Sequence, residues 1–346
     1  MNTPKENPVS TTAAAPSGAP SKKDAPSSGS RLTEHLGDFK RLSFWAENAA
    51  PIGLLLLVIV FSFLSPIFFT TGNISAILMA SSILVVLAIG QSFVITTGGI
   101  DLSIAATMTL GAVVFGLSWD AGHNFWLAVL LGIGASTLMG AASGFLISKG
   151  KVTDFIATLG TMGVATGLAL ILSNGRPITI RSDELLSLTT GKVWIVGLPF
   201  VIAATVAVLA WFVMFRTPFG MHIQAVGGSE EAAVANGVKA GRIRLAVYVI
   251  SGALAGLAAI LLIARVGAAE PAVNQAYLLN SIAAVVLGGV ALAGGRAKIA
   301  GPVLGAILLM ALTNGLTLMG VSQFYQPLAV GLVVVLAALL TRFQSR

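Results

Sequence analysis

The sequence predicts an all-α polytopic membrane protein with about ten transmembrane helices and with both the N- and the C-terminus in the cytoplasm. Of its 346 residues, 56% are hydrophobic and only 10% are charged, whereas about a quarter of a typical soluble domain is charged. Apolar runs of about 20 residues, the length that crosses a bilayer, recur along the chain. Lys and Arg gather in alternate connections between these runs. Composition, run length and charge placement thus lead to the same fold class.

Ten apolar runs have spanning length, and their ends are good to a few residues. They cover residues 50–69, 74–97, 101–118, 125–148, 155–173, 193–215, 245–268, 278–293, 299–319 and 325–341. The run at 278–293 is short and Gly-rich, so a tilted, a broken and a re-entrant helix all remain open. With the N-terminus inside, sixteen of the 20 Lys and Arg residues lie on the cytoplasmic side and four on the other. This positive-inside pattern explains the net charge of +7 without a nucleic-acid partner.

The N-terminal residues 1–48 differ in composition from the rest of the chain. Residues 1–30 are rich in Pro, Ser, Ala and Gly and contain almost no large apolar side chains. Such a segment cannot bury enough surface to offset the entropy of ordering. We therefore expect a disordered cytoplasmic tail over 1–48, in which 31–48 is either a surface helix or plain polar chain. The membrane domain is expected over 49–342.

The residue types argue against enzymatic chemistry. The chain has no Cys, and its three His residues are scattered at positions 35, 123 and 222. A thiol nucleophile, a Cys-based metal site and a His cluster are therefore not expected. The phosphate-binding pattern G-x-x-x-x-G-K-[ST] is absent as well. We expect no catalytic residue, no metal site, no bound cofactor and no ATP hydrolysis by this chain.

Asp101 is the only ionisable side chain between Asn48 and Trp119. It follows Gly98 and Gly99, which can end the second run, and it stands where the third begins. Asp at a helix start accepts hydrogen bonds from free backbone N–H groups, so a helix cap is one interpretation. The other places the carboxylate beside a pathway, since irregular backbone at membrane depth is tolerated inside protein or beside a water-filled cavity.

Glycines four residues apart predict closely packed membrane helices. The pairs are Gly140/Gly144, Gly163/Gly167, Gly252/Gly256 and Gly301/Gly305. A weak internal similarity links "TTGGIDLSIAA" at 96–106 to "LAGGRAKIAGP" at 292–302. Whether it marks a repeat stays open.

Two polar connections are long enough to receive partners. The outer one, 173–199, is either a docking loop or an ordinary connection. In the inner one, 216–244, Pro218 and Gly220 predict a turn, Ser229 is a good N-cap, and Gly237 is placed to end a short helix. Two helical turns are marginal in water, so this helix either docks on a partner or is a capped loop helix that touches nothing.

The inner connection also carries a family motif. "EAAVANG" at 231–237 matches E-A-A-x3-G, the core of the segment with which permeases of ATP-binding-cassette importers contact their ATPase; the usual I-x-L-P continuation is absent. The chain from about 50 to 342 resembles the ribose-type monosaccharide importer permeases. The stretches that carry the resemblance are "ITTGGIDLSIAATMTLGA", "VTDFIATLGTMGVATGLALILSNGRPI", "GMHIQAVGGSEEAAVANGVKAGRIRLAVYVISGALAGLAAIL" and "SIAAVVLGGVALAGGRAKIAGPVLGAILL".

The resemblance implies a permease subunit in the cell inner membrane of a Gram-negative bacterium. Its partners would be a second permease copy, a cytoplasmic ATPase with tandem cassettes and a periplasmic sugar-binding protein, on which sugar selection mainly rests. The coupling loop would be 216–244. The residues expected to contact the ATPase are Ser229, Glu230, Glu231, Ala232, Ala233, Asn236 and Gly237.

Two alternatives remain: a branched-chain amino-acid permease of the same superfamily, and a secondary transporter that works alone. The second would normally carry protonatable groups in mid-membrane, and beyond Asp101 the runs offer very few. A neutral sugar needs hydrogen-bonding groups along its path. Candidate pathway or gate residues are Gln91, Thr96, Thr97, Gly98, Gly99, Asp101, Asn174, Asn280 and Asn314. Each polar side chain among them could instead cap a helix or bond two helices together.

Overall fold

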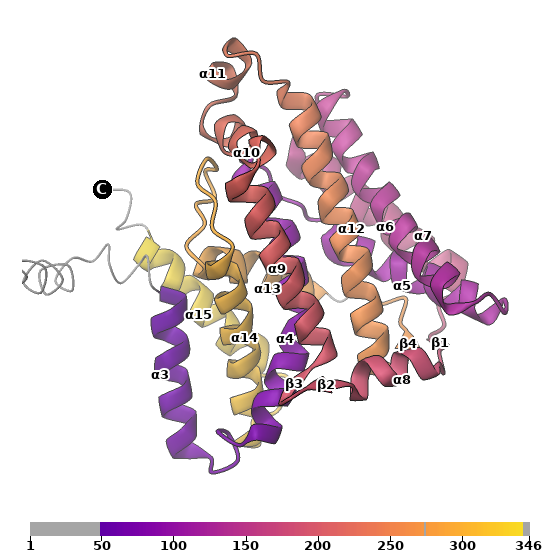
Figure 1. The fold of residues 1–346 in the computed structure, drawn as a ribbon, viewed down its shortest axis with the longest axis vertical. Coiled ribbons are helices and arrows are strands. Elements are labelled where there is room, and N and C mark those ends of the chain that lie inside the picture. Colours follow the sequence, from indigo (N-terminus) through magenta and orange to yellow (C-terminus); the bar gives the residue numbers. More distant parts are fainter. Residues whose placement is uncertain (1–48, 273–274, 342–346) are drawn as a thin grey trace, which may run out of the picture. The chain divides into compact units, whose positions relative to one another are not determined.

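The computed structural model describes residues 49–272 and 275–341, so the expected tail over 1–48 lies outside the described residues. The described chain is nearly all helical (Figure 1). Its helices are α3 (Ala49–Leu64), α4 (Thr71–Thr96), α5 (Ile104–Asp120), α6 (Phe125–Ser148), α7 (Asp154–Ser173), α8 (Asp183–Thr190), α9 (Leu198–Arg216), α10 (Pro218–Gly228), α11 (Glu230–Ala235), α12 (Ala240–Val266), α13 (Gln275–Leu287), α14 (Ala300–Leu318) and α15 (Gln326–Thr341).

Six of the described helices are long and apolar enough to cross a membrane: α4, α6, α7, α9, α12 and α14. Four shorter apolar helices, α3, α5, α13 and α15, overlap the remaining predicted runs. The protein is thus a polytopic, nearly all-α membrane protein. Each of the ten apolar runs read from the sequence overlaps one of these helices.

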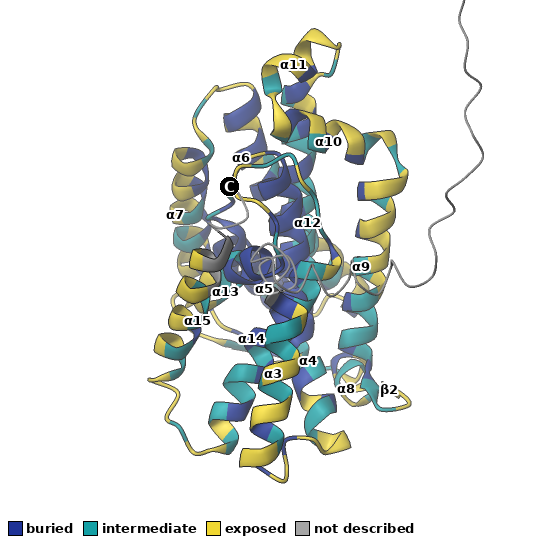
Figure 2. Cartoon of the chain, turned by 90° about the vertical axis from the view of Figure 1, so that its left-hand side faces the viewer, coloured by how far each residue is buried: buried dark blue, intermediate teal, exposed yellow. Residues whose placement is uncertain are grey.

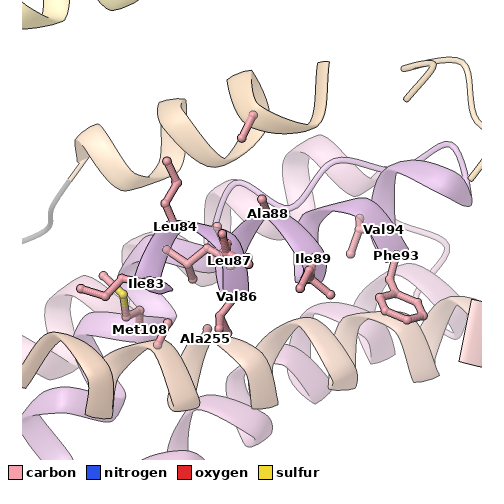
Figure 3. Packing of buried hydrophobic residues seen from close by; sticks show 14 of the residues in the cluster. Ile83, Leu84, Val86, Leu87, Ala88, Ile89, Phe93, Val94, Met108 and Ala255 are labelled. Carbon is pink, nitrogen blue, oxygen red and sulfur yellow. The ribbon is translucent and has the colours of Figure 1, made fainter. Parts of the chain in front are cut away.

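The core is built around α4 and α12. Every residue of α4 from Ser81 onward is buried, as expected for a helix that is apolar on all sides. Figure 3 shows side chains of α4 from Ile83 to Val94, with Ala255 of α12 beside them. Helix α4 contacts α12 most extensively, and α9, α13 and α14 also pack against it. The outer helices carry many exposed residues (Figure 2). Apolar ones are among them, for example Phe63 on α3 and Val208 on α9. In a membrane protein such side chains suit contact with lipid.

Close helix packing at glycines is confirmed for three of the four predicted pairs. Where α6 crosses α12, an added Cβ on Gly140 would lie 2.9 Å from Gly252 Cα, so the two backbones nearly touch. Gly144 lies as close to Leu245 of α12, and Gly301 and Gly305 of α14 meet Gly288 and Ala284 beside them. Small residues let membrane helices approach in this way.

The prediction is wrong for Gly163 and Gly167. Within the described residues, nothing lies within 4 Å of a Cβ built on either glycine. The buried face of α7 is instead formed by Ala165, Ala169 and the threonines beside them. The glycines therefore lie on the open side of this helix.

The inner connection 216–244 is more helical than predicted. Pro218 and Gly220 were expected to form a turn, but they begin α10. Pro is well suited to the first helical position, where no N–H is needed, and the Thr217 hydroxyl accepts a hydrogen bond from Gly220 N at 3.4 Å. The helix predicted to begin at 245 begins at Ala240.

Other helix ends also differ from the sequence prediction, among them the end of α3 at Leu64, five residues before its run ends. The run at 193–215 becomes helical only at Leu198, because Val193 pairs with Val196 in a hairpin of β2 (Lys192–Val193) and β3 (Val196–Gly197). The outer connection also contains α8. The run at 278–293 ends as a helix at Leu287, and Gly289 follows with a left-handed φ of +74°.

Two short strands join the connection 173–199 to the chain that follows α12. β1 (Ile178–Thr179) pairs antiparallel with β4 (Ala268–Ala269), which follows α12. The Ile180 N–H also donates to Gly267 O at 2.9 Å. The connection after α7 is thereby fastened to the end of α12.

Candidate functional site

The short helix α11 has the start that the sequence predicts. Ser229 is extended, with φ −160° and ψ 110°, and its hydroxyl accepts a hydrogen bond from Ala232 N at 3.2 Å. Glu230 and Glu231 occupy the first turn, where the helix dipole favours negative charge. Ser229 also ends α10, so the two helices join without a linker.

Gly237 ends α11 with a φ of +83°. Its N–H donates to Val234 O at 2.9 Å, and the Val238 N–H donates to Ala233 O at 3.0 Å. These two bonds form a Schellman motif, which satisfies the last carbonyls of a helix and requires a left-handed residue at this position. The helix end is therefore set by the glycine.

One face of α11 is anchored and the other is free. Ala233 is buried, and Glu230 forms an ion pair of 2.7 Å with Arg244 of α12. The exposed residues are Glu231, Ala232, Val234, Ala235, Asn236 and Gly237. Of the residues predicted to contact an ATPase, only Ala233 is buried. The anchored helix thus presents mostly small side chains and the Glu231 carboxylate, which forms no ion pair with the described part of the chain.

A basic hollow lies beside α11. Its lining includes Lys149 and Lys151 of the α6–α7 turn, Lys239 and Arg242 at the start of α12, and Glu230 and Val234 of α11. Four basic side chains thus surround the acidic start of α11, and Asp154 at the start of α7 lines a neighbouring hollow with Glu230.

Asp101 lies in the connection between α4 and α5 and is only 2% exposed. Its Oδ1 accepts hydrogen bonds from Ser103 N at 2.9 Å and from Ser103 Oγ at 2.6 Å. Its Oδ2 accepts a bond of 2.7 Å from Ser251 Oγ on α12. Helix α5 begins at Ile104, so Asp101 stands before the helix and not at its cap position. Its carboxylate nevertheless holds the backbone that leads into α5.

The main chain around Asp101 is also held from three helices. The Gln91 side-chain amide of α4, with its oxygen toward Asp101 N and its nitrogen toward Asp101 O, forms two hydrogen bonds of 3.3 Å. The Thr158 hydroxyl of α7 lies 3.3 Å from Ile100 O. A Cβ on Gly99 would collide with the Asp154 carboxylate and lie 2.9 Å from the Tyr248 hydroxyl. This loop is therefore a closely fitted polar segment inside the helix bundle.

The structure brings together only part of the predicted pathway set. Gln91, Thr96, Thr97, Gly98, Gly99 and Asp101 all lie at the junction of α4 with this loop. The Thr96 and Thr97 hydroxyls donate to Ser92 O and Val94 O of α4, at 2.6 and 2.7 Å. Gly98 has a left-handed φ of +83°.

The three predicted asparagines lie elsewhere. Asn174 is the left-handed residue at the far end of α7, with φ 51°. Asn314 of α14 exchanges two hydrogen bonds of 3.0 Å with Asn73 of α4. Asn280 lines an apolar cavity between α13 and α15. Asn174 thus ends a helix, and Asn314 forms hydrogen bonds between two helices. The sequence allowed both roles as alternatives to a place in the pathway.

Sequence reasoning missed the residues that surround the Asp101 loop from other helices. Ser251, Tyr248, Asp154 and Thr158 lie 53 to 150 positions from it in the chain. Among the partners of Asp101, only Ser103 could be predicted from the local sequence. An Asp side chain often accepts a hydrogen bond from the backbone N–H two residues later. A lone serine inside an apolar helix gives no comparable indication.

Comparison with known proteins assigns the family. A family model described as "Branched-chain amino acid transport system / permease component" matches residues 73–340. The ribose import permease protein RbsC of Bacillus subtilis is 40% identical over 298 residues, which cover 85% of this chain and 92% of that protein. RbsC of Escherichia coli K12 is 37% identical, with the same coverage of each chain. The chain belongs to the ribose-type permeases of this family.

The permease is also 32% identical to the D-allose transport system permease protein AlsC of Escherichia coli, over 88% of this chain and 94% of that one. No solved structure matches it. These relatives are sugar import permeases. They therefore favour neither a branched-chain amino-acid permease nor a secondary transporter that works alone. The permease is the membrane subunit of a sugar importer. They come from Bacillus and Escherichia alike, so the similarity does not select a Gram-negative source.

Proposed function

We propose that two copies of this permease form the pathway for a monosaccharide, which a periplasmic binding protein delivers and a cytoplasmic tandem-cassette ATPase drives through. The proposal rests on the way in which α11 is held by the rest of the protein and exposed to a partner. It is capped at both ends, fastened by Glu230 to Arg244 and exposed over its remaining face. A two-turn helix held in this way is suited to insertion into a groove on a partner.

The arrangement in the membrane follows from charge and helix length. All ten apolar helices would span, α3, α5, α13 and α15 included, with both termini in the cytoplasm. The Lys and Arg distribution supports this orientation, and it puts α11 and the basic hollow on the cytoplasmic side. The connection 173–199, with α8, would then face the periplasm and the binding protein.

Within this arrangement, the loop around Asp101 lies at the cytoplasmic end of α4. We assign to it the inner closure of the pathway, with Gln91 and Asp101 holding its shape and Gly98 exposed at its surface. Asn280 remains a candidate for the pathway wall. We do not assign Asn174 and Asn314 to the pathway, because a helix end and an amide pair already account for them.

The substrate is proposed to be a neutral aldose. The relatives are named for ribose, allose and, in an Azospirillum protein, L-arabinose. The permease would be reconstituted in liposomes with its ATPase and binding protein, and uptake of D-ribose, D-allose, L-arabinose and L-leucine would be measured. We expect ATP-dependent uptake of at least one sugar. Uptake of L-leucine alone would support the amino-acid permease, and uptake without the ATPase would support a secondary transporter.

The role of α11 is tested by Glu231→Lys, which reverses the free charge on the exposed face. We expect sugar-stimulated ATP hydrolysis and uptake to fall, while membrane insertion stays normal. Asp120→Lys, the same reversal at the exposed end of α5, is the matched control and should leave both unchanged. Normal hydrolysis and uptake in Glu231→Lys would contradict docking through α11.

A further inference from the structure

Three segments that are distant in sequence meet through their backbones at one point. They are the end of α4 at Thr96, the end of α10 at Gly227, and the connection between α13 and α14 at Gly294 and Gly295. The Gly295 N–H donates a hydrogen bond of 2.9 Å to Thr96 O. A backbone bond therefore joins the two connections directly.

Gly227 closes this junction from the side of α10. A Cβ on Gly227 would collide with Thr96 O and lie 2.6 Å from Gly295 N. A Cβ on Gly294 would lie 2.8 Å from Gly98 N and 2.9 Å from Gly227 O. Real Cβ atoms do not come this close to backbone atoms, so all three segments approach one another at distances that side chains would prevent.

The junction stands between α11 and the Asp101 loop. Gly227 is two residues before Ser229, where α10 passes into α11. Thr96 is the last residue of α4, immediately before the connection that carries Asp101. Ile223 and Val226 bury the inner face of α10, so the helix is packed against the body of the protein. A displacement of α11 must therefore either deform α10 or reach Thr96 and Gly295.

The two connections that meet here are the pair with internal sequence similarity, at 96–106 and 292–302. Each follows one apolar helix and precedes another, α4 and α5 in the first case and α13 and α14 in the second. Both lie at the same end of the bundle as α10 (Figure 1). The contact at Gly227 of α10 therefore involves both the α4–α5 and the α13–α14 connection.

We propose that the contact of Gly227 with Thr96 and Gly295 links α11 to the α4–α5 and α13–α14 connections. When α11 moves, both connections move with it. This assignment rests on the proposed docking of the ATPase on α11. The contact contains no side chain that could rotate to absorb a displacement, and close-packed protein interfaces transmit strain. Gly227 is a positioning residue: it sets the conformation of the inner closure and does not contact the sugar.

The test compares two adjacent glycines. Gly227→Ala inserts a methyl group into the junction, whereas a Cβ on Gly228 meets nothing within 4 Å. Both variants would be reconstituted with the ATPase and the binding protein, and sugar uptake would be divided by ATP hydrolysed. We expect Gly227→Ala to keep hydrolysis while uptake per ATP falls about tenfold, a usual size for coupling between sites. Gly228→Ala should match the unmodified permease.

The outcomes separate this inference from the proposed function. If Glu231→Lys lowers sugar-stimulated hydrolysis and uptake while Gly227→Ala keeps normal uptake per ATP, α11 docks the ATPase but the Gly227 junction does not couple it to the two connections. If Glu231→Lys is fully active, docking itself is wrong. Equal uptake per ATP in Gly227→Ala and Gly228→Ala overturns the inference.

A second measurement covers the case in which Gly227→Ala does not fold. The chain has no Cys, so Ala293→Cys introduces one thiol on the exposed surface next to Gly294. Its reaction rate with a thiol reagent would be compared in the nucleotide-free and the vanadate-trapped complex. We expect the two rates to differ clearly at Ala293→Cys and much less at Lys149→Cys on the α6–α7 turn. Equal rates at Ala293→Cys would show that the connection does not follow the ATPase.

Discussion

The hydroxyl of Ser251 donates a 2.7 Å hydrogen bond to Asp101 Oδ2, and so joins two residues that are 150 positions apart. The bond fastens the α4–α5 connection to the middle of α12, in a region where Asp101 is 2% exposed and Ser251 is fully buried. A buried carboxylate needs such donors, because an unpaired one costs several kcal/mol. Asp101 has three, the N–H and hydroxyl of Ser103 and the hydroxyl of Ser251.

Asp101→Asn should fold and transport nearly normally. Asn keeps an oxygen toward Ser103, and the Ser251 hydroxyl can turn to accept from the new NH₂ group. Asp101→Ala leaves the Ser103 N–H and two hydroxyls without their acceptor, which should cost about 1–3 kcal/mol of stability for an unsatisfied buried group. Thermal unfolding in detergent and uptake in liposomes check both. A folded Asp101→Asn protein that does not transport would show that the charge itself serves the gate.

Gly237→Val should uncouple ATP hydrolysis from uptake, whereas Gly237→Asn should not. A Cβ on Gly237 meets nothing within 4 Å, so the only strain is the left-handed φ of +83°. That conformation costs an L-residue roughly 1–2 kcal/mol, while Asn tolerates it. Uptake per ATP hydrolysed is the measurement, with the amount of inserted protein as the control. Equal uptake per ATP in the two variants would show that the conformation at the end of α11 does not affect coupling.

Gly140→Ala should destabilise the purified permease, and Gly163→Ala should not. The first methyl group collides with Tyr248 O and lies 2.9 Å from Gly252 Cα, an overpacking that typically costs about 1–3 kcal/mol. The second enters open space, where Ala favours the helix by up to about 1 kcal/mol. Thermal midpoints in detergent compare them. A comparable loss in Gly163→Ala would mean that another element covers this face of α7.

Single cysteines should react from opposite sides of the membrane. Ser187→Cys on α8 should be labelled by an impermeant thiol reagent in intact spheroplasts, because 173–199 is proposed to be periplasmic. Lys149→Cys should react only after the membrane is opened. The native chain offers no thiol to interfere. Reversed labelling would overturn the proposed orientation.

The sequence by itself determined the features that depend on local pattern. Apolar runs placed each membrane-length helix to within five residues at either end, because the bilayer imposes a length that is visible in composition. Ser229 and Gly237 marked both ends of α11, because capping acts over three or four residues. The motifs around them were enough to assign the family, as the relatives confirm.

Only the tertiary structure decided which of these features meet. Gly163 and Gly140 look alike in sequence, yet only Gly140 has a helix against it. Nothing local to Ser251 indicates that it faces Asp101, and nothing local to Gly227 indicates that Thr96 and Gly295 lie against it. In an apolar chain, periodicity says little about which face of a helix is inside, since lipid and protein interior are equally apolar. The contacts that arrange the inner closure are backbone and hydroxyl contacts between distant helices, and they exist only once those helices are packed.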